Sequence, residues 1–221
     1  MALNLGQQIT TPAQPNLGSP GASYDERFQS QSFGALNVYF SKLTALFAAL
    51  FGPRGGKWIN NPYGAFQDGT DQTAANTTTA YAITFDTSDF SNGVTLSNSS
   101  RLNVSQAGLY NIQFSIQVEN TTNDTQDIDI WFRKNGTDIP KSNSIYGLLA
   151  RKASGDPSHC IVALNFVTSM AANDYVQIMW RVSNVGVTIQ TYAAGTSPTR
   201  PATPSVITTV SFVSNLSTET A

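Results

Sequence analysis

Apolar and polar residues alternate with a period of two through most of the region 67–215. The clearest run is 110–118, where Tyr, Ile, Phe, Ile and Val alternate with Asn, Gln, Ser and Gln. Successive side chains of a strand point to opposite faces, so this pattern predicts strands with one buried face. Asn135-Gly136 is typical of a tight hairpin. Similar runs are 81–85, 128–132, 162–166, 176–182, 187–189 and 206–212. The region predicts an all-β fold, an antiparallel jelly-roll sandwich.

One window, residues 23–51, has a helical period instead. Ser23, Asp25 and Glu26 suit the start of a helix, and Gly52-Pro53 suits its end. Apolar residues recur at alternating spacings of three and four along an a/d seam of about two and a half heptads. The seam residues are Phe33, Leu36, Phe40, Leu43, Phe47 and Leu50. The seam has two interpretations, a helix that self-associates and a helix that docks on its own domain.

These patterns divide the chain into four parts. Residues 1–22 are polar and rich in Gly, Pro and Gln, which predicts an extended arm because such a segment cannot bury a core. Residues 23–66 hold the amphipathic helix and a Gly/Pro-rich connector. Residues 67–215 form the jelly-roll domain, and residues 216–221 form a short tail.

Charge is scarce, at 12 % of residues, and the net charge is −2. Thr, Ser, Asn and Gln number 25, 23, 18 and 13, about 36 % of the chain. The lack of clustered Lys and Arg argues against binding to nucleic acid or to an anionic membrane surface. No apolar run is long enough to cross a membrane, and the N-terminus does not resemble a signal peptide. The composition therefore favours contact with other proteins over electrostatic binding.

Few residues are suited to catalysis or to metal binding. His159 and Cys160 are each the only residue of their type, and two neighbours on a strand cannot pair as base and nucleophile. The oxygen-rich segment 120–129 resembles a calcium-binding loop in composition, but its spacing differs from that of an EF-hand. We expect no enzymatic activity and no cofactor.

Three segments together resemble the C1q/TNF-like jelly-roll family. Residues 105–114 look like its Gly-x-Tyr-x-Phe segment, and residues 130–137 like its Lys-Asn-Gly hairpin. Residues 164–178 look like its passage from Leu-x-Leu to Gly-Asp-x-Val-x-Leu, with Asn173 in place of the usual glycine. The closing motif of the family is not present in 206–215. The resemblance implies a homotrimer in which one sheet faces the threefold axis, with Tyr175 and Met179 as candidate interface residues. Trp131 is a further candidate for surface contact.

The N-terminal part resembles small virion proteins of bacteriophages, in which a particle-binding segment precedes a C1q-like head. The resemblance is carried by the arm and by residues 39–43, 52–56 and 61–68. It implies a non-enzymatic, trimeric capsid decoration or cement protein that is made in the host cytoplasm and binds the major capsid protein or another virion protein. The alternative is the tip of a tail or head fibre, a receptor-binding module whose head contacts a host-surface glycan.

Overall fold

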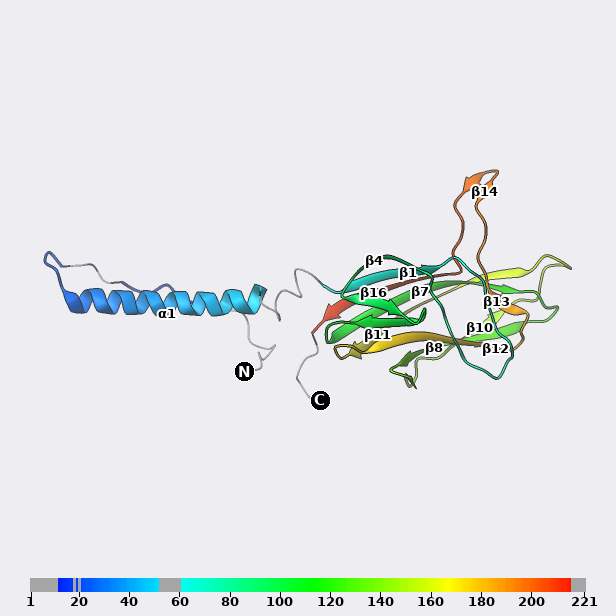
Figure 1. Ribbon diagram of the computed structural model, residues 1–221, viewed down its shortest axis with the longest axis horizontal. Coiled ribbons are helices and arrows are strands. Elements are labelled where there is room, and N and C mark those ends of the chain that lie inside the picture. Colours follow the sequence, from blue (N-terminus) through cyan, green and yellow to red (C-terminus); the bar gives the residue numbers. More distant parts are fainter. Residues whose placement is uncertain (1–11, 18, 20, 52–60, 216–221) are drawn as a thin grey trace. The chain divides into compact units, whose positions relative to one another are not determined.

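The computed structural model describes residues 12–17, 19, 21–51 and 61–215, the side chains of 49–51 excepted (Figure 1). The chain forms two units, one of residues 1–61 with 217–221 and one of residues 62–216. The predictions for residues 1–11, for most of the connector and for the C-terminal tail lie outside the described residues.

Among its described residues, the first unit contains one helix, α1 (Glu26–Phe51), as the apolar period predicts. Asp25 caps its N-terminus, because Oδ1 of Asp25 accepts hydrogen bonds from the backbone N–H of Arg27 at 2.9 Å and of Phe28 at 3.3 Å. The cap is therefore Asp25 rather than the expected Ser23, and the helix starts at Glu26. Its last residue, Phe51, directly precedes Gly52, where a stop was predicted.

The second unit is an antiparallel β-sandwich, and its strands confirm the all-β prediction. The main strands are β1 (Tyr63–Asp68), β6 (Arg101–Val104), β7 (Gly108–Asn120), β8 (Gln126–Lys134), β10 (Ser144–Leu148), β11 (Ser158–Met170), β12 (Tyr175–Val182) and β16 (Val206–Ser214). The shorter strands are β2 (Gln72–Thr73), β3 (Tyr81–Ala82), β4 (Thr87–Asn92), β5 (Val94–Ser97), β9 (Thr137–Asp138), β13 (Val187–Ile189), β14 (Gly195–Thr196) and β15 (Thr199–Arg200).

The main strands pair in the nested order of a jelly roll. β1 pairs with β16, β6 with β12, β7 with β11, and β8 with β10, so the first strand pairs with the last and each inner pair follows in turn. The first sheet contains β11, β7, β16 and β1, extended by β4, β13 and β2. The second contains β6, β12, β8 and β10, extended by β5, β3 and β9. The two sheets are visible as two layers in Figure 1.

The inward side chains of the two sheets form one hydrophobic core. Trp180, Tyr110, Phe66, Phe85 and Phe132 are among its largest fully buried side chains. β7 shows strict alternation, since every second residue from Gly108 to Asn120 is buried. Burial of one face in this way fixes the register, because a one-residue shift would place polar side chains in the core.

Two turns confirm the conformations that the sequence indicates. Asn135 and Gly136 have φ values of 49° and 83°, the left-handed pair that a tight hairpin requires between β8 and β9. Asn173, which stands where the family has glycine, has a φ of 70°. Asparagine tolerates this conformation better than other non-glycine residues do, so the replacement preserves the turn.

Two segments differ from the predictions. Residues 63–66, expected in the connector, form most of β1, and Phe66 is fully buried in the core. The jelly roll therefore begins a few residues before residue 67. Residues 193–204, for which no strand was predicted, contain the β14–β15 hairpin, which projects from the sandwich (Figure 1).

Candidate functional site

The outer face of the first sheet is almost uncharged and carries several exposed apolar residues. Ile161 and Val167 on β11 and Ile207 and Val213 on β16 are exposed, and they point away from the core. Tyr63 and Phe90 extend this apolar surface over β1 and β4. We call these six residues the sheet-one face. Between Ile161 and Val213, the outward positions of β7, β11 and β16, all within the described residues, hold only small or neutral polar side chains.

The outer face of the second sheet differs, because it is polar, charged and hollowed. A shallow depression with a volume of about 320 Å³ lies over β8, β12 and the segment that follows β9. We call it the Trp131 hollow. Its lining residues are Asp129, Trp131, Asp138, Ile139, Lys141, Asn143 and Arg181.

Hydrogen bonds hold Trp131 in a fixed orientation in this hollow. The indole N–H of Trp131 donates to Oδ1 of Asp138 at 2.8 Å, and Nε–H of Arg133 donates to the same oxygen at 2.7 Å. The hydrogen bond from Arg133 lowers the pKa of the Asp138 carboxyl below its ordinary value of 3.8, and the one from Trp131 acts in the same direction. Asp138 is therefore ionised at neutral pH and retains both donors.

A second carboxylate anchors the other side of the hollow. Asp129 is buried, and its Oδ2 lies 2.8 Å from Nη2 of Arg181 on the neighbouring strand. Its Oδ1 accepts a hydrogen bond from Nδ2 of Asn143 at 3.1 Å. The guanidinium of Arg181 is about half exposed, at 48 %, so it satisfies Asp129 while its remaining N–H groups stay accessible.

The two candidate trimer residues, Tyr175 and Met179, also lie on the outer side of this sheet. The ring of Tyr175 is partly exposed and lies below the guanidinium of Arg101, 4.5 Å from its centroid. Met179 is 3 % exposed because Trp131 and Ala82 flank it on the adjoining strands. Met179 therefore has almost no surface to offer a partner.

Three phenylalanines of the helix in the first unit are exposed. Phe33, Phe40 and Phe47, one heptad apart, are 68 %, 58 % and 53 % exposed. Leu36 and Leu43, on the same seam, are half-buried, and the side chain of Leu50 lies outside the described residues. The other half-buried apolar residues of α1 form a neighbouring stripe of Phe28, Ala35, Tyr39 and Leu46. We call the seam with these three exposed phenylalanines the phenylalanine seam. It is an apolar surface separate from the neighbouring stripe.

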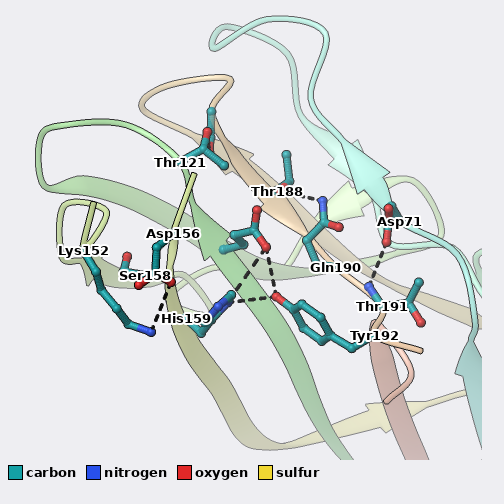
Figure 2. A network of polar contacts seen from close by, with 12 residues as sticks. Asp71, Thr121, Lys152, Asp156, Ser158, His159, Thr188, Gln190, Thr191 and Tyr192 are labelled. Carbon is teal, nitrogen blue, oxygen red and sulfur yellow. Dashed lines mark hydrogen bonds and ion pairs between the residues drawn. The ribbon is translucent and has the colours of Figure 1, made fainter. Parts of the chain in front are cut away.

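A polar network lies at one end of the first sheet, where β7, β11 and β13 meet (Figure 2). The hydroxyl of Tyr192 donates to Oε2 of Glu119 at 3.0 Å and lies 2.9 Å from Nδ1 of His159. Because a hydroxyl has only one hydrogen, Nδ1 of His159 is then the donor in the second contact. Burial raises the pKa of Tyr192 above its usual range, and Glu119 acts in the same direction. Next to Tyr192, Oδ1 of Asp71 accepts from the backbone N–H of Thr191 at 2.8 Å.

The residues considered for catalysis and for calcium have structural contacts instead. His159 is on the outer face, whereas Cys160 packs against the core, so the two side chains lie on opposite sides of β11 as expected. Asn120 is fully buried, and its amide nitrogen donates to the carbonyl oxygens of Asp124 and Leu149 at 2.9 Å each. In the described part of the chain, no three His, Cys, Asp or Glu side chains gather closely enough to hold a metal ion.

Comparison of the sequence with models of protein families and with curated proteins finds no match. Among the residues that the structure describes, no helix is both long enough and apolar enough to span a bilayer. The jelly-roll strand order is thus established by the structure, whereas the C1q/TNF-like family and the virion remain predictions from the resemblance.

Trp131 was predicted from the sequence as a surface contact, whereas Asp138, Ile139, Lys141, Asn143 and Arg181 were not. The position of Asp138 could have been predicted from the sequence, because the Asn135-Gly136 hairpin places it directly opposite Arg133. Asn143 and Arg181 come from segments far along the chain, and no local pattern connects them with Trp131. The sheet-one face was missed because its apolar residues are spread over four strands whose order the sequence does not give.

Proposed function

We propose that this protein is a non-enzymatic, trimeric virion structural protein that decorates and stabilises a capsid shell. The observation that supports the proposal is that each unit exposes several large apolar residues with few charges beside them, the phenylalanine seam in one and the sheet-one face in the other. Exposed apolar residues among neutral side chains are suited to protein–protein contact. Their occupant in this proposal is a second and a third copy of the same chain.

The phenylalanine seam fits a copy of itself. Residues that repeat every seven positions keep one stripe on the same side of a helix, and identical helices can pair along such a stripe as a left-handed coiled coil. The seam is short, so it is a weak interface alone. Association of the sheet-one faces in the same assembly raises the effective concentration of the helices, which strengthens both contacts.

Attachment to a capsid would also strengthen an assembly through added contacts. An N-terminal region that binds only the assembled shell stabilises the shell relative to its free subunits. The major capsid protein is the expected partner, and the resemblance of residues 1–68 to phage virion proteins supports this choice. Electron cryomicroscopy of particles containing this chain should show its density at threefold positions of the shell. Density confined to the tail would contradict the proposal.

The oligomeric state tests the assembly directly. Sedimentation of the full chain should give a mass near three times the protomer mass of 23.7 kDa. Phe40→Gln should weaken the trimer, whereas Tyr24→Gln, a matched change of an exposed aromatic residue outside the seam, should not. A protein that stays monomeric at high concentration would refute the trimer and the decoration role built on it.

A second candidate function is supported by the Trp131 hollow. An aromatic side chain surrounded by fixed hydrogen-bonding groups is typical of a small-ligand site. A sugar can stack its ring on the aromatic side chain and form hydrogen bonds with the polar groups. In this case the head is a receptor-binding module that contacts a host-surface glycan. Binding of the full chain to host cells that is lost with Trp131→Ala would support this function; equal binding by both proteins would contradict it.

A further inference from the structure

The orientation of Trp131 does not depend on a ligand. Its N–H is already bonded to Asp138, so the ring edge is anchored and the ring is held where it borders the hollow. A ring held in this way loses little conformational entropy when a ligand stacks on it. The apolar C–H face of a pyranose is a suitable partner for such a surface, since it buries area without requiring a hydrogen bond from the ring.

The polar groups around the ring are also fixed before binding. Asp129 holds Arg181 and Asn143 in place through its two oxygens, at 2.8 Å and 3.1 Å. Both side chains keep further hydrogen-bonding groups that face the hollow, namely N–H groups on Arg181 and the amide oxygen on Asn143. Hydroxyl groups of a sugar can both donate and accept, so they match this mixed set.

The residues that line the hollow carry two negative and two positive charges, but one of the positive charges has no partner in the described part of the chain. Asp129 is paired with Arg181, and Asp138 is paired with Arg133. Lys141 also lines the hollow, is exposed, and has no hydrogen-bond or ion-pair partner among the described residues. Its φ of 63° is in the left-handed region, which is unfavourable for lysine and places this residue in a turn that glycine or asparagine would occupy at lower cost. Lys141 therefore brings to the hollow a positive charge that no carboxylate of the described residues contacts directly.

We propose that the Trp131 hollow binds an acidic saccharide, a pyranose that carries a carboxylate. The sugar ring stacks on Trp131, the hydroxyl groups bond to Asn143 and Arg181, and the carboxylate lies against Lys141. This proposal rests on the second candidate function, the binding of a glycan by the head, and specifies which chemical class of glycan the head recognises.

Two matched probes test it, methyl β-D-glucuronide and methyl β-D-glucoside, which differ only in a carboxylate or a hydroxymethyl group at C5. The full chain is titrated with each up to about 50 mM, a range suited to weak single-site binding. Binding is followed by the indole N–H resonance of Trp131, which is assigned by its absence in Trp131→Phe. We expect the glucuronide to bind about fivefold more tightly than the glucoside, the contribution of one partly exposed ion pair. The difference should shrink as salt is added.

Variants separate the roles of the residues. Lys141→Gln should remove the preference for the glucuronide and leave glucoside binding unchanged. Lys152→Gln is the matched control, because Lys152 is an exposed lysine outside the hollow whose Nζ lies 3.7 Å from Asp156. It should leave the preference intact. Trp131→Ala lacks the indole resonance, so its binding is followed by saturation-transfer difference NMR of the sugar, and it should bind neither sugar. Unchanged far-UV circular dichroism would show that each variant is folded.

The outcomes distinguish the two proposals. Equal binding of the two sugars would overturn carboxylate recognition and leave glycan binding in place. An equal loss of preference in Lys141→Gln and Lys152→Gln would attribute the effect to general charge and would also overturn carboxylate recognition. No shift of the Trp131 resonance with either sugar, in a folded chain, would overturn both the acidic saccharide and glycan binding at this hollow.

Discussion

The indole nitrogen of Trp131 lies 2.8 Å from Oδ1 of Asp138, across the hairpin that joins β8 to β9. The same oxygen also accepts the Nε–H of Arg133 at 2.7 Å. One exposed carboxylate therefore fixes both an aromatic ring and a guanidinium. The stability and the pH response of the hollow depend on the ionisation of this group.

The titration of Asp138 should reflect these bonds. Because the pKa of Asp138 is lowered in the folded chain, its contribution to stability is present above its ordinary pKa of 3.8 and is lost as the pH falls through the folded value. Carboxyl titration by NMR should place the midpoint of Asp138 below 3.8, and Arg133→Gln should raise it. A midpoint that does not move in Arg133→Gln would contradict the assignment of the shift to this hydrogen bond.

The two outer faces of the sandwich should respond differently to an added charge. Ile161 on the sheet-one face and Ile145 on the other sheet are 62 % and 65 % exposed, so they form a matched pair. Ile161→Lys should reduce the mass measured by sedimentation, because a like charge would then face itself in the assembly. Ile145→Lys should leave the mass unchanged. If both variants or neither variant dissociated, the sheet-one face would not be the interface.

Tyr192→Phe should destabilise the jelly roll by about 1 kcal/mol, because Glu119, whose side chain is largely buried, loses its hydrogen-bond donor. The free energy of unfolding in urea measures this change. Tyr146→Phe is the control, since the hydroxyl of Tyr146 donates only to the exposed carbonyl of Ala163, at 3.2 Å. Its effect should be smaller. Equal effects would mean that the Glu119 contact adds nothing beyond an ordinary surface hydrogen bond.

Stability should fall in alkali because of Tyr110. Burial raises the pKa of its hydroxyl to about 12, and this group donates to the carbonyl of Gln106 at 2.8 Å. The neutral form is favoured in the folded state, so the stability it provides is complete below about pH 10 and is lost as the pH rises toward 12. Near pH 11 the loss should be about 1.4 kcal/mol. Urea unfolding should show a flatter pH dependence for Tyr110→Phe. Identical slopes for both proteins would contradict this account.

Two glycine substitutions should have opposite signs. A Cβ on Gly108 would lie 2.8 Å from the carbonyl oxygen of Ser214 and against the ring of Phe212, so Gly108→Ala should destabilise the jelly roll by about 1–3 kcal/mol. A Cβ on Gly34 would meet nothing within 4 Å, and Gly34→Ala should stabilise the helix by about 1 kcal/mol. Thermal unfolding by circular dichroism measures both. Destabilisation by Gly34→Ala would indicate a close partner on that side of the helix.

Local pattern was sufficient for much of the fold. The long strands β7 and β16 alternate cleanly because each buries one face, and α1 is periodic because apolar residues follow its turns. The polar strand β4 was not predicted, since all its residues but Asn92 are exposed and only pairing with β1 makes it a strand. The hydrogen bonds of β4 are made with β1, so they leave no alternation of apolar and polar residues in the sequence of β4.

The functional surfaces show where sequence reasoning ends. The phenylalanine seam could be read directly, because heptad spacing within one helix determines which side chains share a face. The resemblance implied that Met179 lies at an interface, but Met179 is buried, with Trp131 and Ala82 beside it on the adjacent strands. Phase determines the side of a sheet on which a residue lies, and only the neighbouring strands determine whether it is exposed there.

By itself, the sequence determined the secondary structure with a strong period, the low charge, and the scarcity of residues for catalysis or metal binding. These properties depend on the identity and the local spacing of residues. The tertiary structure decided which strands are neighbours, and so it assembled the sheet-one face from four strands and brought Arg181 and Asn143 to Trp131. The physical reason is that contacts between distant segments are set by the nested pairing of the jelly roll, which local periodicity does not encode.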